Sequence, residues 1–184
     1  FSPVVTANDA TDIVFLGELR PVKGVDVLID AIAVLHSAGT PLTATLVGDG
    51  PQAQALREHV TRLGLEDAIR FAPPMPARAA MALGRVMVIP SRAESLPYVV
   101  LETAAAGKPL ITTMVGGVPE IYGPLSDNLV PVGDAKALAR AIAQTIEQPK
   151  AANDLALKLR TRVAASFPLD AMVDGVLAAY QQAI

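Results

Sequence analysis

Apolar residues along this chain follow two alternating patterns. Short, mainly apolar runs, typical of strands buried on both faces of a sheet, lie at residues 13–16, 42–47, 68–71, 86–89, 109–113 and 129–132. Longer stretches with a period near 3.6 residues predict helices at residues 25–36, 52–62, 78–83, 135–148, 151–166 and 169–184. A further helix is expected to begin near Ser95 and Pro97, after the fourth short run.

Strands that alternate with helices in this way predict an α/β fold. We expect a doubly wound, Rossmann-like parallel sheet of about six strands with helices on both faces. Ligands of such sheets bind outside the carboxyl ends of the strands, near the point where the strand order reverses. Glycines and charged residues gather in the loops that follow four of the runs, at residues 17–24, 48–50, 90–94 and 115–120. We therefore expect these loops to form one site.

Composition excludes several classes of function. The 184 residues suffice for one domain with a good core, and 52% of them are hydrophobic. The formal net charge of -3 leaves no basic surface for nucleic acid. There are no cysteines for disulfides or thiolate metal sites. His36 and His59 fall on predicted helices without a carboxylate at ligand spacing, so we expect surface residues and no metal site.

Two loops have the character of a phosphate site. The loop G-E-L-R-P-V-K-G (17–24) places Arg20 and Lys23 on a glycine-bounded turn, where they could hold a diphosphate; a solvated basic loop is the alternative. The turn G-D-G-P (48–51) lacks the third glycine of a dinucleotide fingerprint. We interpret Gly48 and Gly50 as a sharp turn that lets a ligand approach the backbone, with a plain tight turn as the alternative.

A pair of glutamates marks the segment after the fourth strand. Glu94 comes just before the predicted helix and Glu102 two turns inside it. A helix that opens with Ser and Pro offers free N–H groups and a positive dipole end to an anion. As acid and base of a hydrolase, the two carboxylates would have to flank one bond, whereas two turns add roughly 10 Å of rise. A pair that holds separate hydroxyl-bearing parts of an extended ligand fits better.

The motifs together resemble a known family. The segment P-S-R-A-E-S-L-P-Y-V-V-L-E-T-A-A-A-G-K-P-L-I-T-T-M-V-G-G-V-P-E (90–120) resembles the donor-binding signature of group 1, family 4 glycosyltransferases. L-G-E-L-R-P-V-K-G-V-D-V-L-I-D-A (16–31) and L-V-G-D-G-P (46–51) are similar to the family's phosphate loop and second-strand turn. The resemblance implies a retaining enzyme of the two-domain GT-B architecture that needs no metal and no cofactor. This chain would be the C-terminal half.

The resemblance also implies a division of the chain. Residues 1–12 would be a linker from a missing N-terminal acceptor domain, and residues 13–184 the nucleotide-sugar (donor) binding domain. The partners would be a nucleotide-diphospho-sugar donor and a saccharide or lipid-linked saccharide acceptor, with no nucleic acid. We expect a cytoplasmic protein, working at the inner membrane face in its full-length form. Nucleotide base, donor sugar, acceptor, linkage and oligomeric state are left open, and we expect this half to bind nucleotide without transferring sugar.

Residue roles follow from the resemblance by position. Lys23 and Arg20 would bind the diphosphate and Glu94 the hydroxyls of the transferred sugar, which makes these three the implied catalytic residues. The remaining implied donor-binding residues contact the ribose (Glu102), the diphosphate through backbone amides (Ser95, Leu96) and the nucleobase (Phe71, Ala72). Further donor-binding positions are Gly17, Gly48, Gly50, Gly117 and Glu120.

One departure from the family pattern keeps other functions open. The family usually has Arg directly after the first-strand glycine, whereas this chain has Glu18 there and its arginine at Arg20. Either Arg20 turns to the diphosphate or the site has one cation fewer. The Glu18 departure favours a nucleotide-sugar binding module without turnover. A sugar-nucleotide epimerase of the GT-B type would need an acid/base set near the sugar. A dehydrogenase is least expected, because no G-x-G-x-x-G follows the first strand.

Overall fold

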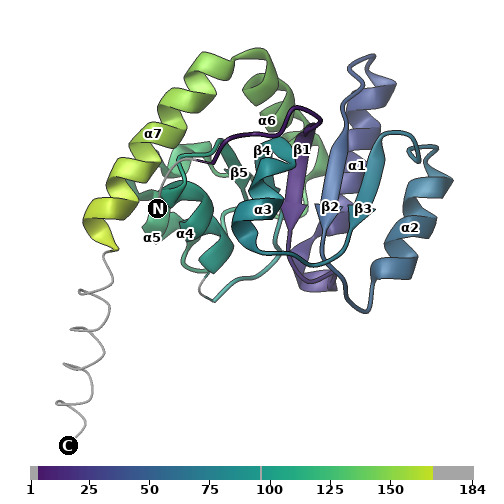
Figure 1. Ribbon diagram of the computed structural model, residues 1–184, viewed down its shortest axis with the longest axis horizontal. Helices are drawn as coiled ribbons and strands as arrows, with labels where there is room; N and C mark the ends of the chain where they lie inside the picture. Colours follow the sequence, from purple (N-terminus) through teal and green to yellow (C-terminus); the bar gives the residue numbers. More distant parts are fainter. Residues whose placement is uncertain (1–3, 96, 168–184) are drawn as a thin grey trace, which may run out of the picture.

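The protein is built around a parallel five-stranded sheet (Figure 1). The computed structural model describes residues 4–95 and 97–167. The strands, in the spatial order β3-β2-β1-β4-β5, are β1 (Thr11–Leu16), β2 (Ala44–Val47), β3 (Ile69–Ala72), β4 (Gly84–Ile89) and β5 (Leu110–Thr112). In register, Ile13 of β1 lies opposite Ala44 of β2 on one side and Val86 of β4 on the other. The strand order reverses between β1 and β4, which confirms the doubly wound fold.

Helices cover both faces of the sheet. The first face carries α1 (Val25–Ser37), α2 (Ala53–Arg62) and α6 (Ala135–Glu147). The second face carries α3 (Ala77–Ala82), α4 (Tyr98–Ala105), α5 (Val118–Tyr122) and α7 (Pro149–Ser166). Two 3-10 turns, η1 (Pro21–Lys23) and η2 (Gly123–Asn128), join these elements.

Alternate side chains along each strand belong to two separate hydrophobic clusters, one on each face of the sheet. Ile13 and Phe15 of β1 pack under α1 and α6, whereas Val14 between them packs under α3 and α4. All three side chains have no exposed surface. Successive side chains of a strand point to opposite faces, so a strand covered on both sides must be apolar throughout. This requirement explains why the strand runs are mainly apolar.

The main differences from the predicted elements concern the sixth strand, the start of the first strand and the helix with Glu102. The predicted sixth strand at 129–132 is reduced to one parallel bridge between Thr113 and Val130. The bridge consists of two hydrogen bonds, from the N–H of Val130 to the carbonyl of Thr112 and from the N–H of Met114 to the carbonyl of Val130. β1 begins at Thr11, inside the predicted linker, and α4 begins at Tyr98, so Glu102 lies just over one turn into its helix instead of two. The predicted helix 169–184 lies outside the described residues.

The first described residues pack against the second helical face. The backbone N–H of Ala7 donates to the carbonyl of Ala82, and that of Thr11 to the carbonyl of Leu83. Lys108 is buried beneath this segment and donates to the hydroxyl of Thr6. Across residues 4–95 and 97–167, no helix combines the length and the apolar character that a membrane crossing requires.

Candidate functional site

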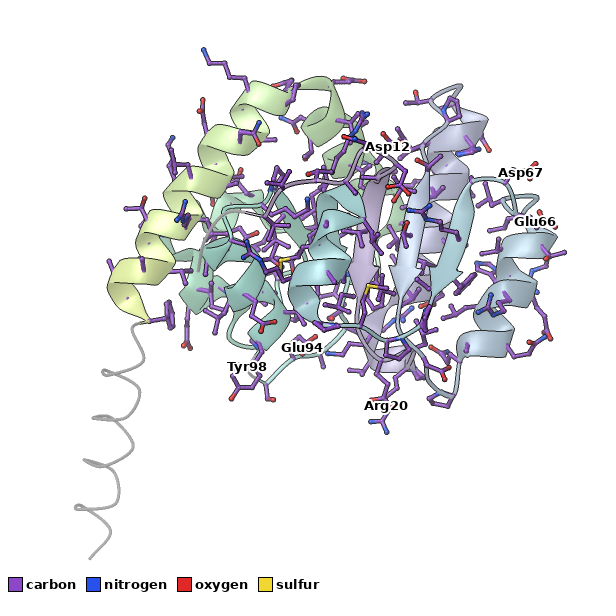
Figure 2. The ribbon with its side chains drawn as sticks, viewed as in Figure 1. Asp12, Arg20, Glu66, Asp67, Glu94 and Tyr98 are labelled. Carbon is purple, nitrogen blue, oxygen red and sulfur yellow. The ribbon has the colours of Figure 1, made fainter. Side chains whose placement is uncertain are left out.

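A cavity of about 250 Å³ opens at the carboxyl ends of β1 and β4, where the strand order reverses. Its walls come from the end of β1 with the following loop, from the loop after β4 and from the first turn of α4. The lining residues are Phe15, Leu16, Gly17, Glu18, Lys23, Ile89, Glu94, Pro97, Tyr98, Val99 and Val100. Figure 2 shows Arg20, Glu94 and Tyr98 at this end of the molecule, with Asp12, Glu66 and Asp67 toward the opposite edge.

A hydrogen-bonded ion pair forms the polar wall of this cavity. The Nζ atom of Lys23 lies 2.6 Å from Oε1 of Glu94, and these side chains are 28% and 11% exposed. The buried hydroxyl of Ser91 donates to the same Oε1 atom at 2.7 Å. Two donors on one oxygen fix the orientation of the carboxylate. The ammonium of Lys23, with three N–H donors, keeps further bonding capacity for a ligand.

The turn at Gly48 packs against Gly17, a residue that lines the cavity. Gly48 has a φ of 144°, and a Cβ built on it would overlap the carbonyl oxygen of Gly17. Gly50 also lies close to a backbone, since a Cβ built on it would be 2.7 Å from the carbonyl oxygen of Leu19. The loop after β1 therefore packs directly against the backbone of these two glycines, because neither glycine has a side chain to separate them. Their predicted contact with the donor stays a prediction.

Arg20 does not line the cavity. Its Nε atom lies 2.7 Å from Oε1 of Glu18, and the two side chains are 56% and 51% exposed. Glu18 itself lines the cavity. The residue that departs from the family pattern thus holds the arginine that was expected to replace the family's cation.

The remaining predicted residues lie around the cavity without lining it. Ser95 is exposed, and a Cβ on Gly117 would lie 3.4 Å from its carbonyl oxygen, so these two positions adjoin. Glu102 is half-buried in α4, and Glu120 is exposed in the first turn of α5. Leu96 falls outside the described residues.

The predicted nucleobase residues lie at the end of β3. The Ala72 carbonyl accepts from the N–H of Gly48, which ties β3 to the turn after β2. Phe71 is half-buried, and the guanidinium carbon of Arg57 lies 4.2 Å from the centre of its ring. One ring face is therefore covered by a cation from α2.

Sequence reasoning missed the residues that hold the two site loops together. Ser91 belongs to the P-S-R-A-E segment, and a Pro-Ser turn after a buried strand was the available signal. The guanidinium of Arg92 binds the carboxylate of Asp26 through Nη1 at 2.7 Å and Nη2 at 2.6 Å. Those hydrogen bonds, opposed by partial burial, lower the pKa of Asp26 from its ordinary value. The two residues are 66 positions apart, so no local pattern could indicate the pair.

Neither histidine lies at the cavity. His59 of α2 pairs with Asp30 of α1 at 2.6 Å, a carboxylate partner that the sequence spacing did not indicate. The ring of His36 contacts the main chain of Leu42. Within the described part of the chain, no group of three or more His, Cys, Asp or Glu side chains is placed to hold a metal ion.

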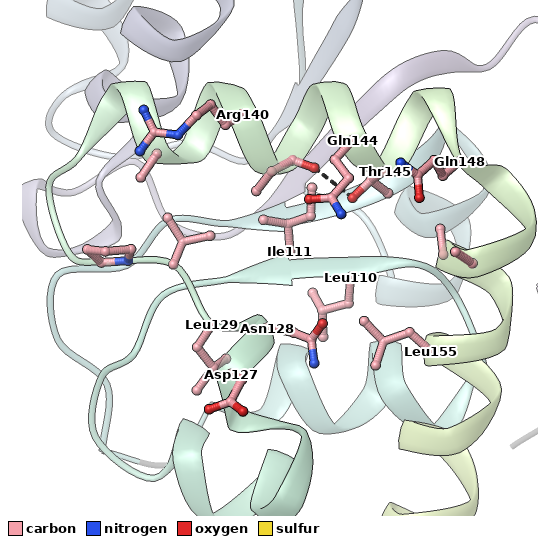
Figure 3. Close-up of a pocket in the computed structure, with 16 residues that line it drawn as sticks. Leu110, Ile111, Asp127, Asn128, Leu129, Arg140, Gln144, Thr145, Gln148 and Leu155 are labelled. Atoms are coloured by element: carbon pink, nitrogen blue, oxygen red, sulfur yellow. Dashed lines mark hydrogen bonds between the residues drawn. The ribbon is translucent and has the colours of Figure 1, made fainter.

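A larger cavity of about 500 Å³ lies elsewhere, along the open edge of β5 (Figure 3). Leu110 and Ile111 of β5 lie at its floor, with Gln144 of α6 and Leu155 of α7 on its walls. Leu129 and Val130, at the start of the predicted sixth strand, also line it. None of the predicted site residues lines it.

Comparison with known proteins identifies the family of this chain. The family model described as glycosyl transferases group 1 matches residues 10–148. The D-inositol 3-phosphate glycosyltransferase of Saccharomonospora viridis is 31% identical over 189 residues, which cover 96% of this chain and 44% of that protein. This chain therefore spans less than half the length of that curated relative.

Two solved structures share the fold along almost the whole chain. Sucrose-phosphate synthase from Thermosynechococcus elongatus has a TM-score of 0.83 and 28% identity, covering 99% of this chain and 49% of that chain. Anabaena Alr3699/HepE, in complex with UDP, has a TM-score of 0.82 and 25% identity, covering 96% of this chain and 50% of that chain.

These likenesses confirm the expected fold and family. The five-stranded sheet with helices on both faces is the architecture of the C-terminal half of a GT-B enzyme. The match of the family model extends from the start of β1 through α6 and so includes every loop around the cavity. This chain belongs to the group 1 glycosyl transferases.

Proposed function

We propose that this chain is the donor-binding half of a retaining, metal-independent glycosyltransferase that takes a sugar from a nucleotide diphospho-sugar. The observation that carries the proposal is the convergence of Lys23 and Glu94 on one cavity at the reversal of the strand order. A cation and a carboxylate side by side suit a ligand that has both phosphates and hydroxyls. The UDP in the Anabaena complex is a nucleoside diphosphate of the kind proposed here.

The proposed roles follow from the charges that develop in the reaction. Breaking the bond between sugar and phosphate builds negative charge on the departing diphosphate, and pre-placed donors stabilise it. Lys23 supplies an ammonium, and the first turn of α4 supplies N–H groups that no helical carbonyl accepts. Glu94 accepts hydrogen bonds from hydroxyls of the transferred sugar. Retention of configuration and independence of metal rest on the family resemblance.

Arg20 can join the diphosphate at small cost. Its ion pair with Glu18 is half exposed on both sides. Exposed pairs of this kind contribute about 0–1 kcal/mol, so exchange of one anionic partner for another is nearly free. The pairing seen without a donor is therefore compatible with a catalytic Arg20.

Calorimetric titration of this chain with UDP, GDP and ADP tests the proposal. We expect one nucleotide to bind selectively, and binding to be unchanged by EDTA. Lys23→Ala should weaken it by about tenfold or more, because a charge-assisted contact is lost, and Glu102→Ala should weaken it through the ribose. The matched control is Lys150→Ala, an exposed lysine of α7 outside the cavity. No binding of any nucleotide, or equal effects of the two lysine changes, would contradict the proposal.

Nucleotide-sugar binding without turnover is the second candidate function. The observation in its favour is the pairing of Arg20 with Glu18, which occupies the second expected cation. Sugar transfer by the full-length protein with a nucleotide-sugar donor separates the two functions. The 184 residues alone should bind nucleotide without transferring sugar, and detectable transfer by them would contradict their assignment to one half of the cleft. The acceptor and a cytoplasmic location at the membrane face stay predictions.

A sugar-nucleotide epimerase has less support. Such an enzyme needs a histidine or carboxylate acid/base set near the sugar. The carboxylates of Glu18 and Glu94 do line the cavity. His36 and His59 are both engaged elsewhere, the first with the main chain of Leu42 and the second with Asp30. Neither lines the cavity.

A further inference from the structure

The cation of the proposed site sits on a very short element. Lys23 is the last residue of η1, a single 3-10 turn of three residues. Within this turn, the N–H of Lys23 donates to the carbonyl of Arg20, and the N–H of Gly24 to that of Pro21. A lone turn of this length has little stability of its own, because fixing a few residues yields only one or two hydrogen bonds. Contacts from outside the turn must hold it.

Besides the ion pair of Lys23 with Glu94, several of those contacts come from one residue of the loop after β4, Arg92. The backbone N–H of Arg92 donates to the carbonyl of Val22 at 2.7 Å. Its Nη1 atom donates to the carbonyl of Pro21 at 2.8 Å. Its two terminal nitrogens also grip the carboxylate of Asp26, in the first turn of α1, at 2.7 and 2.6 Å. Arg92 thus binds the chain before and after Lys23.

The same loop carries the other half of the ion pair. Glu94 lies two positions after Arg92. Ser91, the residue before Arg92, orients the Glu94 carboxylate. The backbone of Pro90 fits against Gly24, where a Cβ would overlap the Pro90 carbonyl oxygen. A displacement of one loop relative to the other would therefore change the distance between Lys23 and Glu94.

We propose that Arg92 is a positioning residue, whose clamp across η1 and Asp26 fixes Lys23 relative to Glu94 before the donor binds. This inference rests on the proposed function, since it assigns the way in which the diphosphate cation is pre-organised. A guanidinium is suited to this task because its planar fork reaches a carboxylate with two parallel bonds and still donates to a carbonyl. A lysine at this position could make only one of these contacts well.

A direct electrostatic role predicts the opposite result for one substitution. If Arg92 and Asp26 acted only through their charges, Asp26→Asn would strengthen binding of an anionic diphosphate by removing a negative charge. In the positioning role, Asp26→Asn weakens binding, because the neutral amide holds Arg92 less firmly. Arg92→Lys keeps the positive charge, but this variant should also bind nucleotide more weakly than the unsubstituted chain.

The test is a double-mutant cycle on nucleotide affinity. The probe is whichever of UDP, GDP and ADP binds the unsubstituted chain most tightly. Arg92→Ala should weaken its binding by about tenfold, as expected when a charged contact is misplaced. In the Lys23→Ala background, the same change should have less than about a twofold effect, because residues that act through one another are not additive. If the double variant lost affinity by the product of the two single losses, Lys23 and Arg92 would act independently and the proposal would be overturned.

Arg85→Ala is the matched control. Arg85 also pairs with an aspartate, Asp12, but at the amino end of β4, and its side chain is 68% exposed. We expect unchanged nucleotide affinity for this variant. Amide hydrogen exchange gives a second measurement that needs no ligand: Arg92→Ala should speed exchange at Lys23 and Gly24, and unchanged exchange there would overturn the clamp.

The outcomes separate this inference from the proposed function. If Lys23→Ala weakens binding and Arg92→Ala does not, the site stands and only the positioning role fails. If Lys23→Ala has no effect, or no nucleotide binds, the assigned role of Lys23 fails and the inference fails with it.

Discussion

The carbonyl oxygen of Glu94 lies directly against the α-carbon of Gly116, so that a Cβ at position 116 would overlap it. Gly116 follows β5 and Glu94 follows β4, and this contact brings the two strand-end loops together. Gly116 also has a φ of 49°, a conformation that side chains disfavour. The position of the site carboxylate therefore depends on a residue that has no side chain.

Gly116→Ala should weaken nucleotide binding by moving the loop that carries Glu94. Gly133→Ala is the control, because Gly133 has a similar φ of 72° and nothing within 4 Å of an added Cβ. The control should lose about 1–2 kcal/mol of unfolding free energy from its backbone conformation alone, with unchanged affinity. Gly116→Ala should lose more stability and at least about tenfold in affinity. If Gly116→Ala and Gly133→Ala had the same unfolding free energy and the same nucleotide affinity, the contact between Gly116 and Glu94 would be unimportant.

The pair formed by Lys23 and Glu94 should be energetically coupled. Lys23→Met leaves the mostly buried carboxylate without its counter-charge, at a cost of about 1–3 kcal/mol in unfolding free energy. Adding Glu94→Gln should recover part of that loss, with a coupling energy of about 1 kcal/mol or more in urea unfolding.

The pair of Arg85 and Asp12 provides the comparison for that cycle. Its charged atoms are 3.5 Å apart and Arg85 is 68% exposed, so its coupling energy should stay below about 0.5 kcal/mol. The prediction fails if both cycles give the same coupling.

Glu18→Ala should strengthen nucleotide binding. The substitution removes a negative charge from the cavity wall and releases Arg20 from its present partner. We expect a gain of about twofold to fivefold in affinity, larger at low ionic strength because exposed charges are screened by salt. Glu66→Ala, an exposed change toward the opposite edge of the molecule (Figure 2), should have no effect. Weaker binding after Glu18→Ala would indicate that Glu18 itself contacts the donor.

Lys108 should make stability depend on alkaline pH. Burial lowers the pKa of its ammonium from 10.5 to about 8. Between these two pH values the unfolded chain binds a proton that the folded chain does not, so stability rises with pH across this window. Below pH 8 the folded chain holds a buried charge, and the penalty is fully present.

Lys108→Met should therefore stabilise the protein at pH 7, by up to about 3 kcal/mol, and the gain should vanish above about pH 10.5. Urea unfolding at pH 7 and pH 10 measures the difference, with Lys150→Met as an exposed control. The same gain at both pH values would mean that hydrophobicity, and not charge, is responsible.

Local patterns were enough to predict five strands of the sheet and the edge at which the loops with Lys23 and Glu94 meet. The apolar run that contains Ile13 and Phe15 reflects a strand that must be apolar on both faces. The loops that carry Lys23 and Glu94 each follow such a run, and carboxyl ends of parallel strands share one edge. These features depend on neighbours within a few residues, which is why the sequence alone determined them.

Tertiary contacts decided how the charges are used. Arg20 turns to Glu18, and Arg92 reaches Asp26 across 66 positions of the chain. The expected sixth strand is reduced to one bridge, between Thr113 and Val130. Contacts between half-exposed loops differ from their alternatives by only about a kcal/mol each. The packing of whole strands and helices selects among them, and no local pattern records that packing.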